Sequence, residues 1–184
     1  MLLFLGVDQS LNGTGLCLLD RAGAVVHLET VNPGKRRGAE RLAYVKSSLL
    51  ALLNSKVKFV CFEGYAYHST GRVFELGEIG GVLRLVVFEH GIPDTTVAPA
   101  TLKKFATHNS GAKKAAMVKA AMAEGLSVAD DNQADAFFLA MIARCIHTGI
   151  APSTRVRMDV VHQLQHPLPK TPVRRLRKLT KHSL

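Results

Sequence analysis

The sequence predicts an α/β protein in which a central, mixed five-stranded sheet is flanked by helices. Three observations favour this fold class. Short apolar runs of strand length end in polar turns, the first three runs follow one another closely, and later runs alternate with segments whose apolar residues recur at helical spacing. A chain of 184 residues, 47% of them hydrophobic, is long enough to bury one full core.

The first third of the chain predicts an antiparallel meander followed by a helix. The expected elements are strands over residues 2–8, 15–19 and 25–31 and a helix over residues 39–54. The first strand is apolar along its whole length, as in strands that are buried on both faces, but it ends on a carboxylate at Asp8. The helix follows the basic run Lys35-Arg36-Arg37, whose charges oppose the helix dipole. We interpret this run as facing an anionic partner, with a solvated basic loop as the alternative.

The rest of the folded region predicts two more strands and four helices. These are strands over residues 58–63 and 95–98 and helices over residues 72–90, 100–107, 112–124 and 131–147. The first of these strands again ends on a carboxylate, Glu63. Three glycines, at positions 77, 80 and 81, interrupt the helix over residues 72–90. Because glycine costs a helix about 1 kcal/mol relative to alanine, we expect a close helix or backbone approach at these positions.

Composition changes beyond Gly149, so we place the end of the folded domain there. Residues 150–184 read as a proline-containing basic tail that is ordered only in part. The net charge of the chain is +10, and residues 151–184 supply +7 of it through eight Lys and Arg against one Asp. A positive balance of this size favours a polyanionic partner, nucleic acid first. A chain kept in solution by surface lysines is the alternative.

Several classes of protein do not fit the sequence. No apolar run reaches the length needed to cross a bilayer, and the first residues lack the positive region and cleavage site of a signal peptide. The three cysteines, Cys17, Cys61 and Cys145, are odd in number and lie in apolar segments without C-x-x-C spacing. We therefore expect a cytoplasmic protein with reduced, buried thiols and no membrane partner.

Four carboxylates are the candidate chemical groups. Asp8 and Glu63 end two strands, and Asp131 and Asp135, four residues apart, share one face of the last helix. Such a cluster repels itself unless hard cations neutralise it, which suits Mg²⁺ or Mn²⁺. Two such ions would support in-line displacement at phosphorus. The alternatives are a turn-capping role for Asp8, a loop position for Glu63, a helix N-cap at Asp130 or Asp131 and a solvent-facing position for Asp135.

The order of these elements resembles the ribonuclease H-like fold, and the motifs resemble the RuvC family of Holliday junction resolvases, particularly its small viral or phage members. Six motifs stand in the order of the family and span about residues 1–147. They are Gly6-Val7-Asp8-Gln9-Ser10 with Thr14-Gly15, the strand ending in Glu63, Leu76-Gly77 with Gly81-Val82, Leu102-Lys103-Lys104, Ser110-Gly111-Ala112-Lys113-Lys114, and Asn132-Gln133-Ala134-Asp135-Ala136. The resemblance implies that residues 1–149 form a ribonuclease H-like nuclease domain.

The resemblance implies that Asp8, Glu63 and Asp135 are three of the metal-binding acids. The family usually carries a fourth acid three residues before the last, and Asn132 occupies that position here. We assign Asp131 as the substitute because a carboxylate in the first helical turn still reaches the ion, with Asp130 in reserve. The resemblance also assigns Lys103 and Lys114 to the scissile phosphate, where they would offset charge developing in the transition state. Solvated positions on helix faces are the alternative for both lysines.

Further residues are candidates for DNA binding. An aromatic in the loop after the glutamate stacks near the crossover in the family, and Tyr65 and Tyr67 lie close to that position, with half-buried packing as the alternative. The basic candidates are Lys35, Arg36, Arg37, Lys104 and Lys113, and in the tail Arg174, Arg175, Arg177 and Lys178. Phosphate contacts by the tail would be strongly salt-dependent; a disordered, solubilising tail is the alternative.

The resemblance implies a homodimer whose interface uses the helix matching residues 72–90, so that two sites act on one four-way junction. We therefore predict a metal-dependent endonuclease that uses Mg²⁺ or Mn²⁺, two ions per site, to resolve Holliday junctions or other branched DNA by paired nicks. One alternative is a non-catalytic junction-binding protein on the same scaffold, which Asn132 favours. Another is an actin-like ATPase or sugar kinase, although the sequence lacks a second glycine-rich phosphate loop.

Overall fold

Strand β1 occupies the centre of a five-stranded sheet, and this position determines where its terminal carboxylate lies. The strands are β1 (Leu3–Asp8), β2 (Thr14–Asp20), β3 (Val25–Val31), β4 (Val57–Glu63) and β5 (Asp94–Val97). Their order is β3-β2-β1-β4-β5 in the computed structural model, which describes residues 1–65 and 72–167. β1, β2 and β3 pair antiparallel, whereas β4 is parallel to both β1 and β5. The predicted mixed five-stranded sheet is confirmed.

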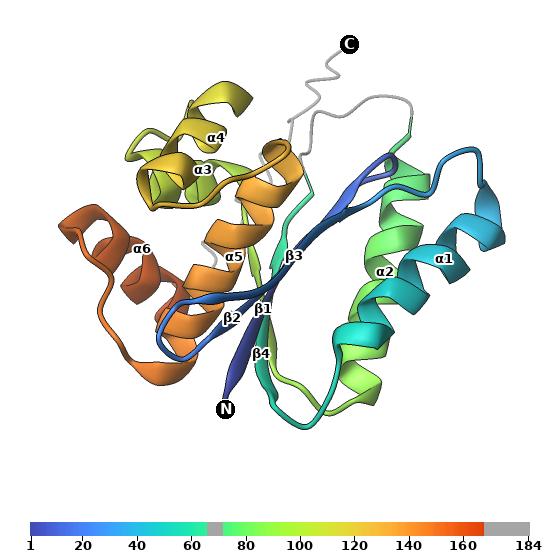
Figure 1. The fold of residues 1–184 in the computed structure, drawn as a ribbon, viewed down its shortest axis with the longest axis horizontal. Helices are drawn as coiled ribbons and strands as arrows, with labels where there is room; N and C mark the ends of the chain where they lie inside the picture. Colours follow the sequence, from blue (N-terminus) through green and yellow to red (C-terminus); the bar gives the residue numbers. More distant parts are fainter. Residues whose placement is uncertain (66–71, 168–184) are drawn as a thin grey trace, which may run out of the picture.

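Helices cover both faces of the sheet (Figure 1). They are α1 (Gly38–Leu52), α2 (Val73–Glu89), α3 (Pro99–Thr107), α4 (Lys114–Ala123), α5 (Asp131–Thr148) and α6 (Arg155–Gln165). α1 and α2 lie on one face, and α3, α4, α5 and α6 lie on the other. The sheet therefore separates two hydrophobic cores, one around Leu5 and Leu83 and the other around Phe4 and Phe138. Because β1 contributes to both cores, its run of apolar residues is continuous rather than alternating.

Helix α5 lies directly against β1 and β2 because the facing residues are small. A Cβ atom at Gly6 would collide with the main chain of Ala136 and Ala140, and one at Gly15 would collide with the main chain of Asn132. Only glycine at these strand positions allows the helix to approach this closely. The close approach brings the first turns of α5 to the carboxyl end of β1.

Helix α6 extends the packed structure beyond residue 149, where we had placed the end of the domain. Its Val160 and Val161 are buried, and so is Arg157. The Arg157 guanidinium donates to the main-chain oxygens of Phe105 and Ala106 at 3.0 and 3.4 Å and pairs with Glu124 at 2.6 Å. A hydrogen-bonded buried arginine thus fastens α6 to the ends of α3 and α4. The part of the expected tail over residues 150–167 therefore includes a packed helix, and the remainder of that tail, residues 168–184, lies outside the described residues.

No helix in residues 1–65 and 72–167 combines the length and the apolar composition that crossing a membrane requires. The three cysteines are free and buried, as expected.

Candidate active site

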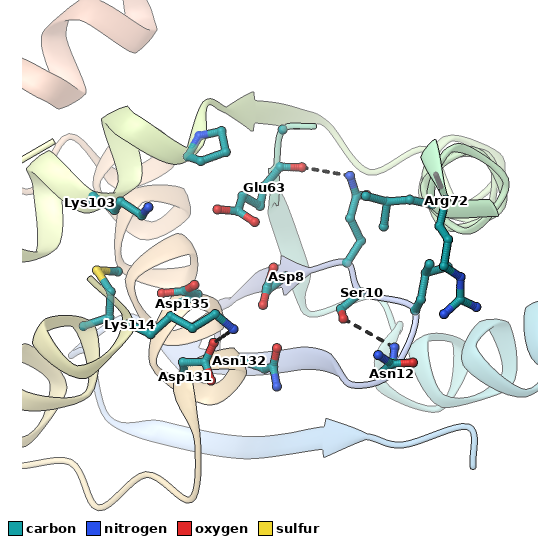
Figure 2. Close-up of a pocket in the computed structure, with 16 residues that line it drawn as sticks. Asp8, Ser10, Asn12, Glu63, Arg72, Lys103, Lys114, Asp131, Asn132 and Asp135 are labelled. Atoms are coloured by element: carbon teal, nitrogen blue, oxygen red, sulfur yellow. Dashed lines mark hydrogen bonds and ion pairs between the residues drawn. The ribbon is translucent and has the colours of Figure 1, made fainter. Parts of the chain in front are cut away.

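The predicted carboxylates gather in one cavity of about 440 Å³ at the carboxyl ends of β1 and β4 (Figure 2). Asp8 ends β1, Glu63 ends β4, and Asp131 and Asp135 project from the first turns of α5. β1 and β4 are parallel neighbours, paired up to Val7 and Phe62, so their next residues emerge side by side. Residues 55 positions apart in sequence are thereby brought to one site.

Burial raises the pKa of three of these carboxyls, and neighbouring charges raise the pKa of two of them further. Burial raises the pKa of Asp8 well above its ordinary value, and the charges of Glu63 and Asp135 raise it further. Burial also raises the pKa of Glu63, against the opposing effect of Lys103 and Lys114. The pKa of Asp135 rises to about 7, first through burial and then through Glu63 and Asp131. A nearby cation would reverse all of these shifts by stabilising the charged forms.

Two lysines line the same cavity. Lys103 comes from α3 and Lys114 from the first residue of α4. The Lys114 ammonium forms an ion pair with Asp131, and this hydrogen bond raises the pKa of Lys114. Lys114 is otherwise 81% exposed, so its ammonium stands at the mouth of the cavity, where an incoming anion would meet it.

The candidates for the fourth ligand differ in what they contact. Asp130, the reserve, is the N-cap of α5: its carboxylate accepts from the Gln133 main-chain N–H and from the Thr30 hydroxyl. It does not line the cavity, so the capping alternative holds for Asp130. Asp131 and Asn132 both line the cavity, Asp131 in its pair with Lys114. The choice between Asp131 and Asn132 stays a prediction.

The cavity contains polar residues that the sequence analysis did not single out. Gln9, Ser10 and Asn12 line it from the β1–β2 turn, and Arg72 lines it from the start of α2. The turn residues belong to a motif that we had read only for its aspartate. Arg72 lies nine residues from Glu63, and nothing in the local pattern indicated that it returns to the same cavity.

Most of the predicted DNA-binding residues lie outside the cavity. Tyr65 is half-buried; its hydroxyl donates to the Gly77 oxygen at 3.4 Å, and its ring lies 5.4 Å from the Arg84 guanidinium carbon. This matches the half-buried alternative rather than a ring free to stack on a base. Arg36 lies over the Tyr44 ring, and Lys35, Arg37, Lys104 and Lys113 are exposed. Tyr67, Arg174, Arg175, Arg177 and Lys178 lie outside the described residues.

The donor set in the cavity fits a hard divalent cation. Carboxylate and amide oxygens are the ligands that Mg²⁺ and Mn²⁺ prefer. Asp135 Oδ1 is buried and has no hydrogen-bond partner among the described residues, an arrangement that is costly unless another group binds it. Within residues 1–65 and 72–167, however, no three His, Cys, Asp or Glu side chains already form a finished metal-binding group. Side-chain rotation, including release of Asp131 from Lys114, would therefore accompany binding.

The mixed sheet, with acids at the ends of β1 and β4 and on α5, defines a ribonuclease H-like scaffold. The chain is similar to two solved structures. One is a Thermus thermophilus RuvC structure (21% identity, TM-score 0.67, covering 80% of this chain and 97% of that one). The other is T. thermophilus RuvC in complex with a Holliday junction substrate (22% identity, TM-score 0.66, covering 77% of this chain and 92% of that one). No curated protein sequence matched the chain. The family model for the crossover junction endodeoxyribonuclease RuvC matches residues 4–144, and the chain belongs to the RuvC family.

Proposed function

We propose that this protein is a homodimeric, divalent-metal-dependent endonuclease that resolves four-way DNA junctions by paired nicks. One observation carries the proposal: in a chain of the RuvC family, four acids and two lysines from β1, β4, α3, α4 and α5 line a single cavity. The printed description of the family is crossover junction endodeoxyribonuclease, and the structure neighbour at 22% identity is described with a Holliday junction substrate. Branched DNA is therefore the proposed substrate class.

The proposed roles follow from the chemistry of each group. Asp8, Glu63, Asp135 and Asp131 would hold Mg²⁺ or Mn²⁺, which, when bound, supplies an activated water and neutralises charge on the phosphate. We propose two ions per site because four carboxylates are available to hold them. Lys103 and Lys114 would hold non-bridging phosphate oxygens and offset charge that develops in the transition state. The ion pair with Asp131 holds the Lys114 side chain over the cavity until phosphate arrives.

The proposed dimer uses one face of α2. Phe74, Leu85 and Phe88 are 90%, 55% and 77% exposed, and they fall on a single stripe of the helix together with Gly77 and Gly81. A Cβ atom at either glycine would meet nothing within 4 Å, so neither is required by contacts within this chain. Exposed aromatic side chains beside glycines favour close packing against a second copy of the same helix. The two copies of the cavity would then face one junction.

The test compares cleavage of a labelled four-way junction with cleavage of a linear duplex of the same sequence, in Mg²⁺, in Mn²⁺ and in EDTA. We expect paired, symmetric nicks near the crossover with either metal, no cleavage in EDTA and an intact duplex. Equal cleavage of both substrates would replace the proposal with a general nuclease.

Asn132, at the position of the usual fourth acid, favours one second candidate, a junction-binding protein without catalysis. Tight junction binding with no cleavage in either metal would support that candidate. We prefer the enzyme to the non-catalytic protein because Asp131 provides a carboxylate that lines the same cavity as Asn132.

A further inference from the structure

We propose that Arg84 is a positioning residue that locks together the strand ends bearing Asp8 and Glu63 and connects them to helix α2. The inference rests on the proposed nuclease function and extends it to a residue that touches neither carboxylate. Arg84 lies in α2, one helical turn beyond Gly80, and its guanidinium donates to the Gly80 main-chain oxygen at 3.3 Å.

The contacts of Arg84 converge on the two strand ends. Nη1 donates to Gln9 Oε1 at 2.9 Å, and Nη2 donates to the Glu63 main-chain oxygen at 3.4 Å. Gln9 in turn donates from Nε2 to the same Glu63 oxygen at 3.0 Å. Arginine only donates and a carbonyl only accepts, so these partners fix the orientation of the Gln9 amide. Gln9 is 5% exposed, so the three groups form a shielded cross-link.

This cross-link begins where the ladder between β1 and β4 ends. The β1–β4 ladder pairs residues only as far as Val7 and Phe62. Asp8 and Glu63 come one residue later, where no β1–β4 pair holds the two strands together. The Arg84–Gln9–Glu63 chain ties the main chain at this level without neutralising a carboxylate, which leaves both side chains free for a cation. Stacking of the guanidinium 4.7 Å from the Phe62 ring centre restrains it further.

Gly80 provides the space for this network. A Cβ atom there would overlap the Tyr65 hydroxyl and would lie 2.8 Å from both Arg84 Nη1 and Gln9 Oε1. The unexpected glycine in the middle of α2 is thereby explained by a side-chain cluster. The atoms in the way are the ends of flexible side chains, so alanine would displace the network while keeping the helix. Since α2 also carries the proposed dimer stripe, Arg84 connects the dimer helix to the site.

Arg84→Met tests the inference, with Arg144→Met as the matched control. Arg144 is also a half-buried helical arginine that donates to main-chain oxygens, those of Arg21 and Ala22, but it does so at the opposite end of the sheet. Both variants lose one positive charge. Gly80→Ala displaces the network while improving helix propensity, and Arg84→Lys keeps the charge without the forked donor.

Four quantities are measured for each variant: the single-turnover cleavage rate of a four-way junction, the Kd for that junction in EDTA, the thermal midpoint, and the rise in that midpoint caused by Mn²⁺ without DNA. We expect Arg84→Met and Gly80→Ala to cleave about 10- to 100-fold more slowly, because small misplacements of reacting groups are costly. Their Kd should stay within about threefold of wild type. The Mn²⁺-induced rise should shrink in both, Arg84→Lys should remain impaired, and Arg144→Met should match wild type.

Two results would overturn the inference. The first is a cleavage rate and a Mn²⁺ response of Arg84→Met that equal those of Arg144→Met. The second is a slower Arg84→Met whose thermal midpoint also falls, together with a Gly80→Ala variant that cleaves at the wild-type rate. A wild-type protein that does not cleave would instead reject the proposed function. In that case the Mn²⁺ response of the variants still decides whether Arg84 positions the carboxylates.

Discussion

At the scale of single residues, the chemistry depends on carboxylates that are buried beside one another. Asp8 is 6% exposed, and burial and the charges of three further acids, Glu63, Asp135 and Asp131, raise its pKa. Such a cluster is costly unless a bound cation offsets the repulsion. We therefore expect cleavage to be most sensitive to substitution at Asp8 and Glu63.

Asp8→Asn and Glu63→Gln should therefore each lower cleavage of a four-way junction by about 10³-fold or more. Junction binding should persist or tighten, since each change removes a negative charge that repels phosphate. Gel-shift and cleavage assays on the same preparations measure both properties. Asp159→Asn, an exposed position on α6, is the control and should behave as wild type. Normal cleavage by either site variant would contradict the site assignment.

Substitutions at two neighbouring residues, Asp131 and Asn132, test which of them supplies the fourth metal ligand. We expect Asp131→Ala to lower the cleavage rate about 100-fold, through loss of a carboxylate ligand and release of Lys114 from its ion pair. Asn132→Ala should lower the rate less than about tenfold, because a neutral amide is a weaker ligand for a hard cation. Rates measured across a Mn²⁺ titration separate weaker metal binding from slower chemistry. The reverse order of effects would assign the ligand to Asn132.

Asp135 makes the metal-free protein sensitive to pH. Its pKa is about 7 in the folded protein against an ordinary value of 3.8, so the folded state holds this proton more tightly than the unfolded chain. Stability in EDTA should therefore fall as pH rises from about 4 to 7, by on the order of 3 kcal/mol from this group. Asp135→Asn should flatten the decline in thermal midpoint between pH 5 and pH 8. An unchanged slope in the variant would show that other groups cause it.

At the scale of elements, α5 and α2 differ in the surface that each presents: α5 packs small residues against the sheet, whereas α2 exposes aromatic residues on its outer face. The small residues of α5 face the sheet, where Gly6 and Gly15 admit its main chain. α2 instead leaves Phe74 and Phe88 exposed on its outer face, although its inner face packs in the core through Ile79 and Leu83. An exposed stripe of this kind on a well-packed helix indicates a partner surface.

Leu85→Glu combined with Phe88→Glu should convert the proposed dimer into a monomer. Burying each charge in the interface would cost about 2 kcal/mol or more, which together weakens the dimer at least about 100-fold. Analytical ultracentrifugation reads the oligomeric state directly. Met122→Glu replaces a similarly exposed apolar side chain on α4 and should leave the dimer intact. A double variant that sediments as wild type would exclude this face of α2 as the interface.

At the scale of the whole molecule, positive charge concentrates at the C-terminal end. Residues 168–184 contain six Lys and Arg and no Asp or Glu. Truncation after residue 150 would also remove α6 and its buried Arg157, so the informative truncation is after Pro167.

The chain truncated after Pro167 should bind a four-way junction more weakly, with a shallower dependence on salt. Each phosphate contact contributes about 0.9 to the slope of log K against log salt on duplex DNA, so loss of several contacts should lower the slope by roughly 2–5. Fluorescence anisotropy between 50 and 300 mM salt measures this slope. An unaltered slope would show that the tail does not hold DNA, and an unchanged thermal midpoint verifies that α6 remains packed.

Most of the strands and helices, and the acidic character of the site, could be predicted from local sequence patterns. Strand and helix periodicity is local, so the strands ending at Asp8 and Glu63 and the helix carrying Asp135 could be read directly from the pattern of apolar residues. Carboxylates at the ends of apolar strands are costly, and this local signal marked the metal candidates. The basic end of the chain was also visible, but its folded part was not, because α6 packs through only a few apolar residues, among them Val160 and Val161, and through the buried Arg157, within a segment rich in charged and polar residues.

Which residues lie next to one another became clear from the assembled fold. It assigned Asp130 to a helix cap and Asp131 to the cavity, because the difference depends on how the first turn of α5 faces Thr30 and Lys114. It also brought Arg72 to the cavity and Arg84 and Gln9 behind the strand ends, although they are separated by up to 75 residues. Such contacts depend on strand order and on the close approach allowed by glycines. Local sequence patterns do not encode distances between elements, so these contacts become visible only when the sheet and its helices are assembled.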